Sequence, residues 1–272
     1  KLMAVVINGT FDDSQRDGLW AVAGFVGFVD QWEDFEAAWP QLLETHGIPY
    51  LHMKEMGKPE GVYKKWHPPQ EHYEETANFF GDVARTIGRC GIEGFGAITR
   101  IRDLEKFNAE KNLDLQAYPL AALGTLIALW NRHPREPVEL FFDHVEKVQS
   151  KLCKAKEYAD SDREYAGDFD QVQMIPLCKA WTSKDVPALQ AADFLVWEYG
   201  KTHLDRAAWW QQENKPSDED LRWEAFDTWM KEEKPRTRKS ILALLERTSF
   251  TGFIWDYDKL CEAHRTRGGV WA

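Results

Sequence analysis

The sequence predicts an α/β protein in which helices flank a mixed β-sheet of five strands. Two early runs rich in β-branched and aromatic residues, separated by a polar turn, predict an antiparallel hairpin. Short apolar runs then alternate with longer helical stretches, as in strands that are joined by crossover helices. Antiparallel strands followed by such an alternation imply a mixed sheet covered by helices.

The elements follow in order along the chain. The first strand covers 3–7, can extend to Phe11, and leads into a polar turn at 12–18; the second strand covers 19–29. A helical insertion at about 30–89 holds a helix from Asp30 with a kink or break at Pro40, a short strand at 48–53, a loop at 54–69 and a helix at 70–87. Strands at 91–101, 138–142 and 171–177 then alternate with helices at 115–130 and 145–159.

A late helix begins near Ser183, Asp185 and Pro187, which are typical helix-start residues. It is apolar nearly all round, which predicts burial. Gln190 and Asp193 interrupt it and share one face. A buried carboxylate is costly unless it is paired or holds a metal, so Asp193 is either a satisfied structural acid or a functional one.

Length and composition set limits on the class of protein. With 272 residues, 43% of them hydrophobic, the chain can fold as one large domain or as a domain with an appendage. We divide it into a domain at 1–203 and a mostly helical, charged extension at 204–272 that packs on it. The net charge of −11 argues against broad coating by nucleic acid, but it allows a local basic groove or an acidic site that recruits divalent cations.

Cysteine spacing and hydropathy bear on the compartment. The four cysteines form no Cys-x-x-Cys pair, so neither a zinc ribbon nor a disulfide framework is indicated. There is no long apolar run that would indicate a membrane span. We therefore expect a cytoplasmic protein that does not contact membranes, with a homo-oligomer or a protein partner left open.

Three acids occupy positions that suit metal-dependent chemistry. Asp12 ends the first predicted strand, Asp143 follows the strand at 138–142, and Asp193 lies in the late helix. Each alone is weak evidence, because Asp is common at turns. Together they predict a carboxylate cluster that needs a counter-charge, for which Mg²⁺ or Mn²⁺ is suited. Two such ions about 4 Å apart activate water for phosphodiester cleavage.

Several segments resemble a known family when they are taken in this order. They are Asp12-Asp13-Ser14, Val22-Ala23-Gly24, 32–39, Tyr50-Leu51-His52-Met53-Lys54, Phe141-Phe142-Asp143 and Leu189-Gln190-Ala191-Ala192-Asp193. Together they are similar to a bacterial family of RNase H-like domains of unknown function, with Asp-Glu-Ser-Gly and Gln-x-Ala-Asp motifs. The resemblance covers roughly 3–203, and its Gln-Ala-Ala-Asp segment is the most specific. It implies an RNase H-like fold and a metal-dependent nuclease site, although fold alone does not fix function.

The N-terminal motif departs from that pattern. Gln15 stands where the family signature has Gly, and Asn8-Gly9-Thr10 offers a second alignment to the Asp-Gly-Ser that often ends an RNase H-type strand. In that alignment Asn8 replaces the first acid, and catalysis then depends on Asp12 or Asp13. We prefer Asp12, because its spacing to Ala23-Gly24 fits the signature better.

The sequence thus predicts an RNase H-like nuclease that acts on nucleic acid, with Asp12, Asp143 and Asp193 as catalytic residues and as ligands of Mg²⁺ or Mn²⁺. Asp13, Gln190 and His52 are the supporting candidates, and Glu146 is either a fourth ligand or a first-turn helix acid. The alternative is a catalytically degenerate RNase H-like binding or assembly module of a mobile-element or defence system. A small-molecule hydrolase that uses His52 or His144 as base has no nucleophile motif behind it.

Overall fold

A six-stranded mixed sheet forms the centre of the molecule. The computed structural model describes residues 6–69, 71–134, 136–144, 147–161, 168–177, 184–210 and 250–266. The strands are β1 (Ile7–Arg16), β2 (Leu19–Gly27), β3 (Glu93–Arg100), β4 (Val138–Phe142), β5 (Val172–Pro176) and β6 (Phe250–Trp255), in the spatial order β5-β4-β1-β2-β3-β6. The strands β1, β2 and β3 pair antiparallel, whereas β4, β5 and β6 each pair parallel with their neighbours. The predicted α/β class with a mixed sheet is confirmed.

The sheet has one strand more than the five that we expected. The sixth, β6, lies within the 204–272 segment that we assigned to a helical extension, and it pairs with β3. Its Phe-Thr-Gly-Phe-Ile-Trp sequence is rich in β-branched and aromatic residues, which suits a strand. The C-terminal segment therefore contributes to the same sheet as the N-terminal hairpin.

The predicted hairpin is confirmed, but its turn is much shorter than expected. The polar residues at 12–16 belong to β1, because they pair with the start of β2 from Ala23 back to Leu19. Asp17 and Gly18 make the turn, with φ values of 43° and 80°. A two-residue turn of type I′ needs positive φ at both positions. Asp12 therefore lies inside a paired strand and does not end it.

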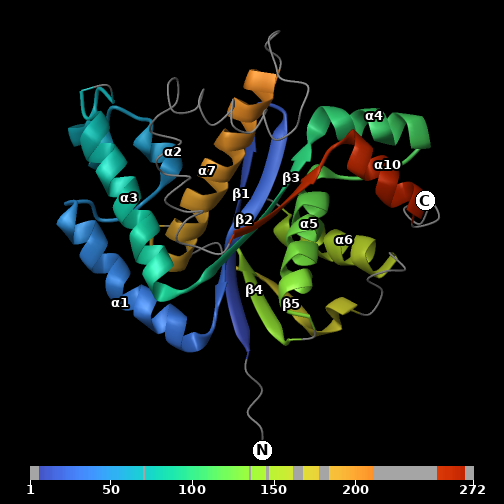
Figure 1. The fold of residues 1–272 in the computed structure, drawn as a ribbon, viewed down its shortest axis with the longest axis horizontal. Helices are drawn as coiled ribbons and strands as arrows, with labels where there is room; N and C mark the ends of the chain where they lie inside the picture. The colour runs from blue at the N-terminus through green and yellow to red at the C-terminus, as the bar shows by residue number, and fades with distance from the viewer. Residues whose placement is uncertain are drawn as a thin grey trace, which may run out of the picture.

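Helices cover both faces of the sheet (Figure 1). They are α1 (Val29–Thr45), α2 (Met53–Met56), α3 (Tyr73–Cys90), α4 (Ile101–Lys111), α5 (Ala117–Arg132), α6 (Val148–Ser161), α7 (Pro187–Trp210) and α10 (Tyr257–Thr266), with short 3-10 turns η1 (Gly61–Trp66) and η2 (Asp168–Gln171). On one face α7 lies against β1 and β2, and α1 and α3 pack together outside it; on the other, α5 covers β2, β3 and β6. A separate apolar core fills each face.

This layering explains why α7 is apolar nearly all round. It packs against the sheet and also contacts α1 and α2, so residues 188–196 are all buried. The predicted burial of this helix is confirmed. Pro187 is its first residue, where a missing N–H costs nothing, while Ser183 lies outside the described residues.

Some predicted elements are wrong. The segment 48–52 forms no strand, and α2 begins at Met53. The helix α1 continues through Pro40 to Thr45, which contradicts a break at Pro40, the second of the two alternatives that we expected there. The helix α4 was not predicted at all, because its sequence is largely charged and buries only Leu104 and Phe107.

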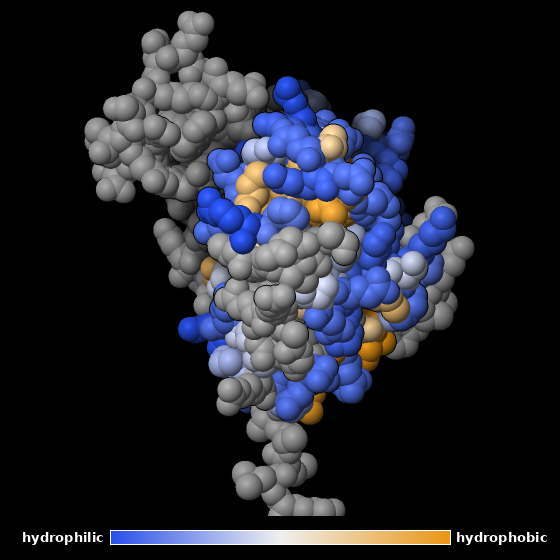
Figure 2. Space-filling model, turned by 90° about the vertical axis from the view of Figure 1, so that its right-hand side faces the viewer, coloured by the Kyte–Doolittle hydropathy of each residue, from blue (hydrophilic) through white to orange (hydrophobic). Residues whose placement is uncertain are grey.

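The described surface is mostly hydrophilic where Figure 2 shows it, and hydrophobic residues gather there only in small separate patches. None of the helices in the described ranges is both long enough and apolar enough to cross a membrane.

Candidate carboxylate site

Two of the three acids lie side by side because of how β1 and β4 pair. In this parallel pair Phe11 is opposite Phe142, and the Asp143 N–H donates to the Phe11 carbonyl at 2.9 Å. The ladder thus continues by one residue beyond β4, and Asp143 falls next to Asp12. Phe11 and Phe142 stack at 5.4 Å within the α5-side core. Because side chains alternate along a strand, Asp12 points to the other face, where α7 lies.

The third acid reaches this face from α7. Asp193 is buried, with only 9% of its surface exposed, and its Oδ2 accepts the backbone N–H of Met53 at 2.7 Å. That N–H opens α2, so the carboxylate also caps a short helix. One oxygen of Asp193 therefore has the structural role that the sequence left open, because it binds the first N–H of α2.

Electrostatics show that the acids share one environment. Burial raises the pKa of Asp12 well above its usual range, and the charges of Asp193, Asp143 and Asp13 raise it further, in that order. Among the neighbouring charges, that of the helix acid Asp193 has the largest effect on the pKa of Asp12. A cluster of this kind cannot stay fully ionised without a counter-charge.

The other two acids are shifted in the same direction. Burial raises the pKa of Asp193 to about 6, opposed by the hydrogen bond from Met53 and the nearby imidazole of His52. Burial also raises the pKa of Asp143, opposed by the His144 N–H and by His52. His52 therefore lies close enough to both acids to lower their pKa values.

Asp13 lies on the opposite face of the sheet from Asp12, in a different environment. It pairs with Val22, a residue of the α5-side core, and its Oδ2 accepts the indole N–H of Trp20 at 3.0 Å. Burial raises its pKa to about 6, opposed by Trp20 and by Lys151. The ammonium of Lys151 lies 5.1 Å from the ring centres of both Trp20 and Tyr118. Asp13 influences Asp12 mainly through its charge and its backbone N–H.

The strand register also separates Asn8 from the acids. Asn8 shares a face with Asp12 but lies four residues earlier, about 13 Å along the strand, opposite Glu139. Its carbonyl accepts the indole N–H of Trp32 at 2.9 Å. Asp12, and not Asn8, is therefore the first-strand residue beside Asp143 and Asp193.

Gln190 fixes the loop that carries His52. Its Oε1 accepts two N–H groups, from the Trp39 indole at 3.0 Å and from the Leu51 backbone at 2.8 Å. Its Nε2 donates to the Lys184 carbonyl at 3.2 Å. Gln190 and Asp193 thus hold the alternate N–H groups of Leu51 and Met53, which explains why 48–52 lies along α7 and does not pair as a strand.

An ion pair locks the outer side of the same loop. Lys184 Nζ lies 2.7 Å from Glu55, which also accepts the Tyr50 hydroxyl at 2.7 Å. These hydrogen bonds lower the pKa of Glu55 to about 2. His52 Nδ1 lies 3.4 Å from Glu55 on this side. His52 is therefore held between an ionised carboxylate and the acid cluster.

The oxygen donors suit a hard divalent cation. One oxygen each of Asp12, Asp143 and Asp193 accepts a backbone N–H, from Asp13, His144 and Met53 respectively. Within the described ranges no residue donates to the second oxygen of any of the three. The same ranges hold no group of three His, Cys, Asp or Glu side chains already arranged to hold a metal ion. Glu146 lies outside the described residues.

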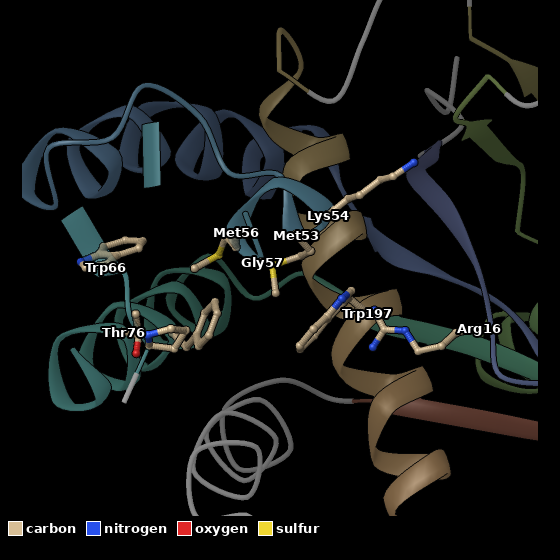
Figure 3. A pocket seen from close by; sticks show the side chains of 10 residues that line it. Arg16, Met53, Lys54, Met56, Gly57, Trp66, Thr76 and Trp197 are labelled. Atoms are coloured by element: carbon tan, nitrogen blue, oxygen red, sulfur yellow. The ribbon is translucent and has the colours of Figure 1, made fainter. Parts of the chain in front are cut away.

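A pocket of about 480 Å³ opens on the α7 face and is lined in part by Met53, whose N–H is bonded to Asp193. Figure 3 shows Trp66 and Trp197 on opposite sides of it, with Met53 and Met56 between them. Arg16 lies beside Trp197, with its guanidinium carbon 4.7 Å from the ring centre. Met53 belongs both to this pocket and, through its N–H, to the Asp193 contact.

Sequence reasoning missed Arg16 and Trp197, although a signal was present. Trp197 follows Asp193 by four residues in a helix, and Arg16 follows Asp12 by four in a strand; either spacing keeps a residue on the face of its predecessor. Lys151 gave no such signal, because it approaches from α6. Lys184 precedes α7 but pairs with Glu55, which is far from it along the chain.

Comparison with known proteins adds no relative: no protein-family model matches the sequence, and no curated protein shows significant similarity to it.

Proposed function

We propose that the protein is a divalent-metal-dependent phosphodiesterase that cleaves nucleic acid, with an RNase H-like arrangement of its sheet. The observation that carries the proposal is the placement of Asp12 on β1 beside Asp143, which directly follows β4, with the charge of Asp193 from α7 raising the pKa of Asp12. Three antiparallel strands followed by two parallel ones support the RNase H-like interpretation.

A divalent cation is the natural partner for such a cluster. Burial already raises the pKa of all three acids, so their ionised forms are costly without positive charge nearby. The second carboxylate oxygens of the three acids are the groups that would hold Mg²⁺ or Mn²⁺. When bound, such ions activate water and stabilise the leaving oxygen in phosphodiester hydrolysis.

The chain itself supplies orientation. Backbone N–H groups hold one oxygen of each acid, which restricts the rotation of the side chain and directs the other oxygen. Asp12 and Asp143 are anchored on adjacent paired strands, which are rigid supports for a site. His52 adds a group that favours the ionised forms of Asp143 and Asp193.

A cleavage assay tests the proposal. Purified protein is incubated with RNA, DNA and an RNA–DNA hybrid in Mn²⁺, Mg²⁺ or EDTA. We expect cleavage in the cation buffers only, and a loss of at least about a hundredfold in Asp12→Asn and Asp193→Asn, since each removes a ligand charge. Asp258→Asn is the matched control, because Asp258 is an exposed acid of α10. Cleavage that persists in EDTA, or in Asp193→Asn, contradicts the proposal.

The second candidate function is a non-catalytic RNase H-like module. It is favoured by the capping role of Asp193 and by the absence, within the described residues, of a ready-made metal group. Titration with Mn²⁺ separates the two: a ligand that binds the folded state raises the melting temperature by mass action. A module without a metal site shows no such rise and no cleavage.

A further inference from the structure

We propose that the pocket beside Asp193 binds one unstacked base of a single-stranded nucleic acid, and that Arg16 binds the phosphate of that nucleotide. The proposal rests on the proposed function, because it names the form of nucleic acid that the same face receives. It concerns residues outside the carboxylate cluster, so it can be tested by binding alone.

The lining of the pocket suits a flat aromatic ligand. Met53, Met56, Trp66, Phe80 and Trp197 contribute polarizable sulfur and aromatic surface. Trp66 and Phe80 are buried, whereas Trp197 is half-buried, and Arg16 and Lys201 lie over its ring at 4.7 Å and 5.0 Å. A base that stacks on the indole of Trp197 therefore takes the place of one of these two cations. A volume of about 480 Å³ falls within the range of small-ligand pockets.

The pocket is placed one step from the acids. Trp197 lies one helical turn beyond Asp193 in α7, about 6 Å along the helix axis. On β1, Arg16 is four residues beyond Asp12 and shares its face. Arg16 and Trp197 meet in a cation–π contact at 4.7 Å, so the strand and the helix run from the acids to the pocket in the same direction. A nucleotide seated here would be a near neighbour of a phosphodiester at the acids.

Positive charge at the pocket complements a phosphate. Arg16 and Lys54 line it, and neither forms an ion pair with an acid in the described ranges. Cations without an acid partner are notable in a chain whose net charge is −11. Arginine binds phosphate through a planar fork of donors, and Arg16 is already oriented by the Trp197 ring.

The chemistry selects an unpaired strand. The faces of bases in a duplex are covered by their neighbours, so a base must be extruded or already unpaired before it can stack on Trp197. Base–aromatic stacking with basic contacts to the backbone is the usual mode of single-strand binding, and it tolerates any base. We therefore expect little dependence on base identity.

Fluorescence anisotropy in EDTA tests the proposal with the full chain, because metal-dependent cleavage is absent there. The probes are a short labelled single-stranded oligonucleotide in DNA and RNA form, the same sequence as a duplex, and an oligomer of abasic phosphates of equal length. We expect the single strands to bind about tenfold more tightly than the duplex and the abasic oligomer.

Variants then separate base from phosphate. Trp197→Leu should weaken binding of the base-containing strands about tenfold and that of the abasic oligomer by less than about threefold, since the latter loses only the orientation of Arg16. Trp197→Phe, which keeps a flat ring, should lose less than about threefold with either. Arg16→Gln should weaken all oligomers alike. Arg102→Gln, an exposed arginine on α4, is the matched control, and melting temperatures verify that each variant is folded.

The outcomes separate the proposal that the pocket binds a base from the proposal that the acids catalyse cleavage. Equal binding of abasic and base-containing strands, no effect of Trp197→Leu, or no binding of any oligomer overturns the pocket. Binding that depends on Trp197, in a protein that cleaves nothing with Mn²⁺, supports the pocket and removes the proposed reaction. Cleavage with Mn²⁺ that Trp197→Leu does not change supports the proposed reaction and removes the pocket.

Discussion

At the scale of single residues, the two oxygens of Asp193 have different surroundings. One accepts the Met53 N–H and fixes the start of α2, while the other receives no hydrogen bond from the described residues. An asparagine in its place keeps a carbonyl oxygen for Met53 and loses the charge. Asp193→Asn is therefore a test of charge, and not of the loop, which makes it more informative than an alanine variant.

Gln190 lies on the same face of α7 as Asp193 and has a structural role, so its removal should lower the stability of the fold. Gln190→Leu leaves the buried indole N–H of Trp39 and the N–H of Leu51 without their acceptor. A buried unsatisfied donor costs about 1–3 kcal/mol, so the loss of the acceptor for both donors should lower the free energy of unfolding by about 2–6 kcal/mol. Urea unfolding followed by circular dichroism measures the change.

The control for Gln190 is Gln149→Leu on α6, where the side chain is exposed; it should change stability by less than about 0.5 kcal/mol. Equal stability of Gln190→Leu and the wild type would show that the loop at 48–53 does not depend on the Gln190 amide.

At the scale of elements, the position of Asp12 depends on how closely β1 approaches β2. Gly24 lies opposite Phe11, one residue from the Asp12–Ala23 pair. A Cβ at Gly24 would meet the Thr10 carbonyl and would lie 2.7 Å from the Phe11 Cα, so neighbouring backbone would have to move. The Ala-Gly step of the second strand thus has a physical reason in the close approach of β1.

Gly24→Ala should therefore destabilise the protein by about 2 kcal/mol or more, because overpacking against backbone cannot be relieved by rotation of a side chain. Gly200→Ala in α7 is the matched control: its Cβ would meet only Ala21 at 3.9 Å, and alanine is the better helix former by about 1 kcal/mol. Thermal unfolding of the two variants should shift in opposite directions, and parallel shifts would contradict this account of Gly24.

Sequence patterns identified elements whose signal is local. The run Val138–Phe142 and the acid after it were predicted with correct bounds. The signal for a short apolar strand with a polar end is contained in the residues of the strand itself. The segment 48–53 was misjudged, since its N–H partners are Gln190 and Asp193, some 140 positions later in the chain. For the acids, strand alternation alone places Asp12 and Asp13 on opposite faces, but the face that meets α7 follows only from the tertiary packing.

At the scale of the whole molecule, the acid cluster should set how stability depends on pH. A carboxyl whose pKa is raised by folding binds its proton more tightly in the folded state. Its stabilising contribution is complete below the unfolded pKa of about 4 and is lost as the pH rises through the folded value. Asp13 and Asp193 have folded pKa values of about 6, and those of Asp12 and Asp143 are also raised.

We therefore expect the melting temperature in EDTA to fall between about pH 5 and pH 8, as these acids ionise without a counter-charge. Mn²⁺ should reverse the fall at the upper end, because it binds the ionised cluster of the folded state. Asp193→Asn should raise stability in EDTA near pH 8 by about 1 kcal/mol or more, and should abolish the Mn²⁺ effect. Asp258→Asn, on exposed α10, should retain both the fall and its reversal. A wild-type melting temperature that rises from about pH 5 to pH 8 in EDTA would show that the acids are not held in this raised state, and the electrostatic basis for cation binding would be lost.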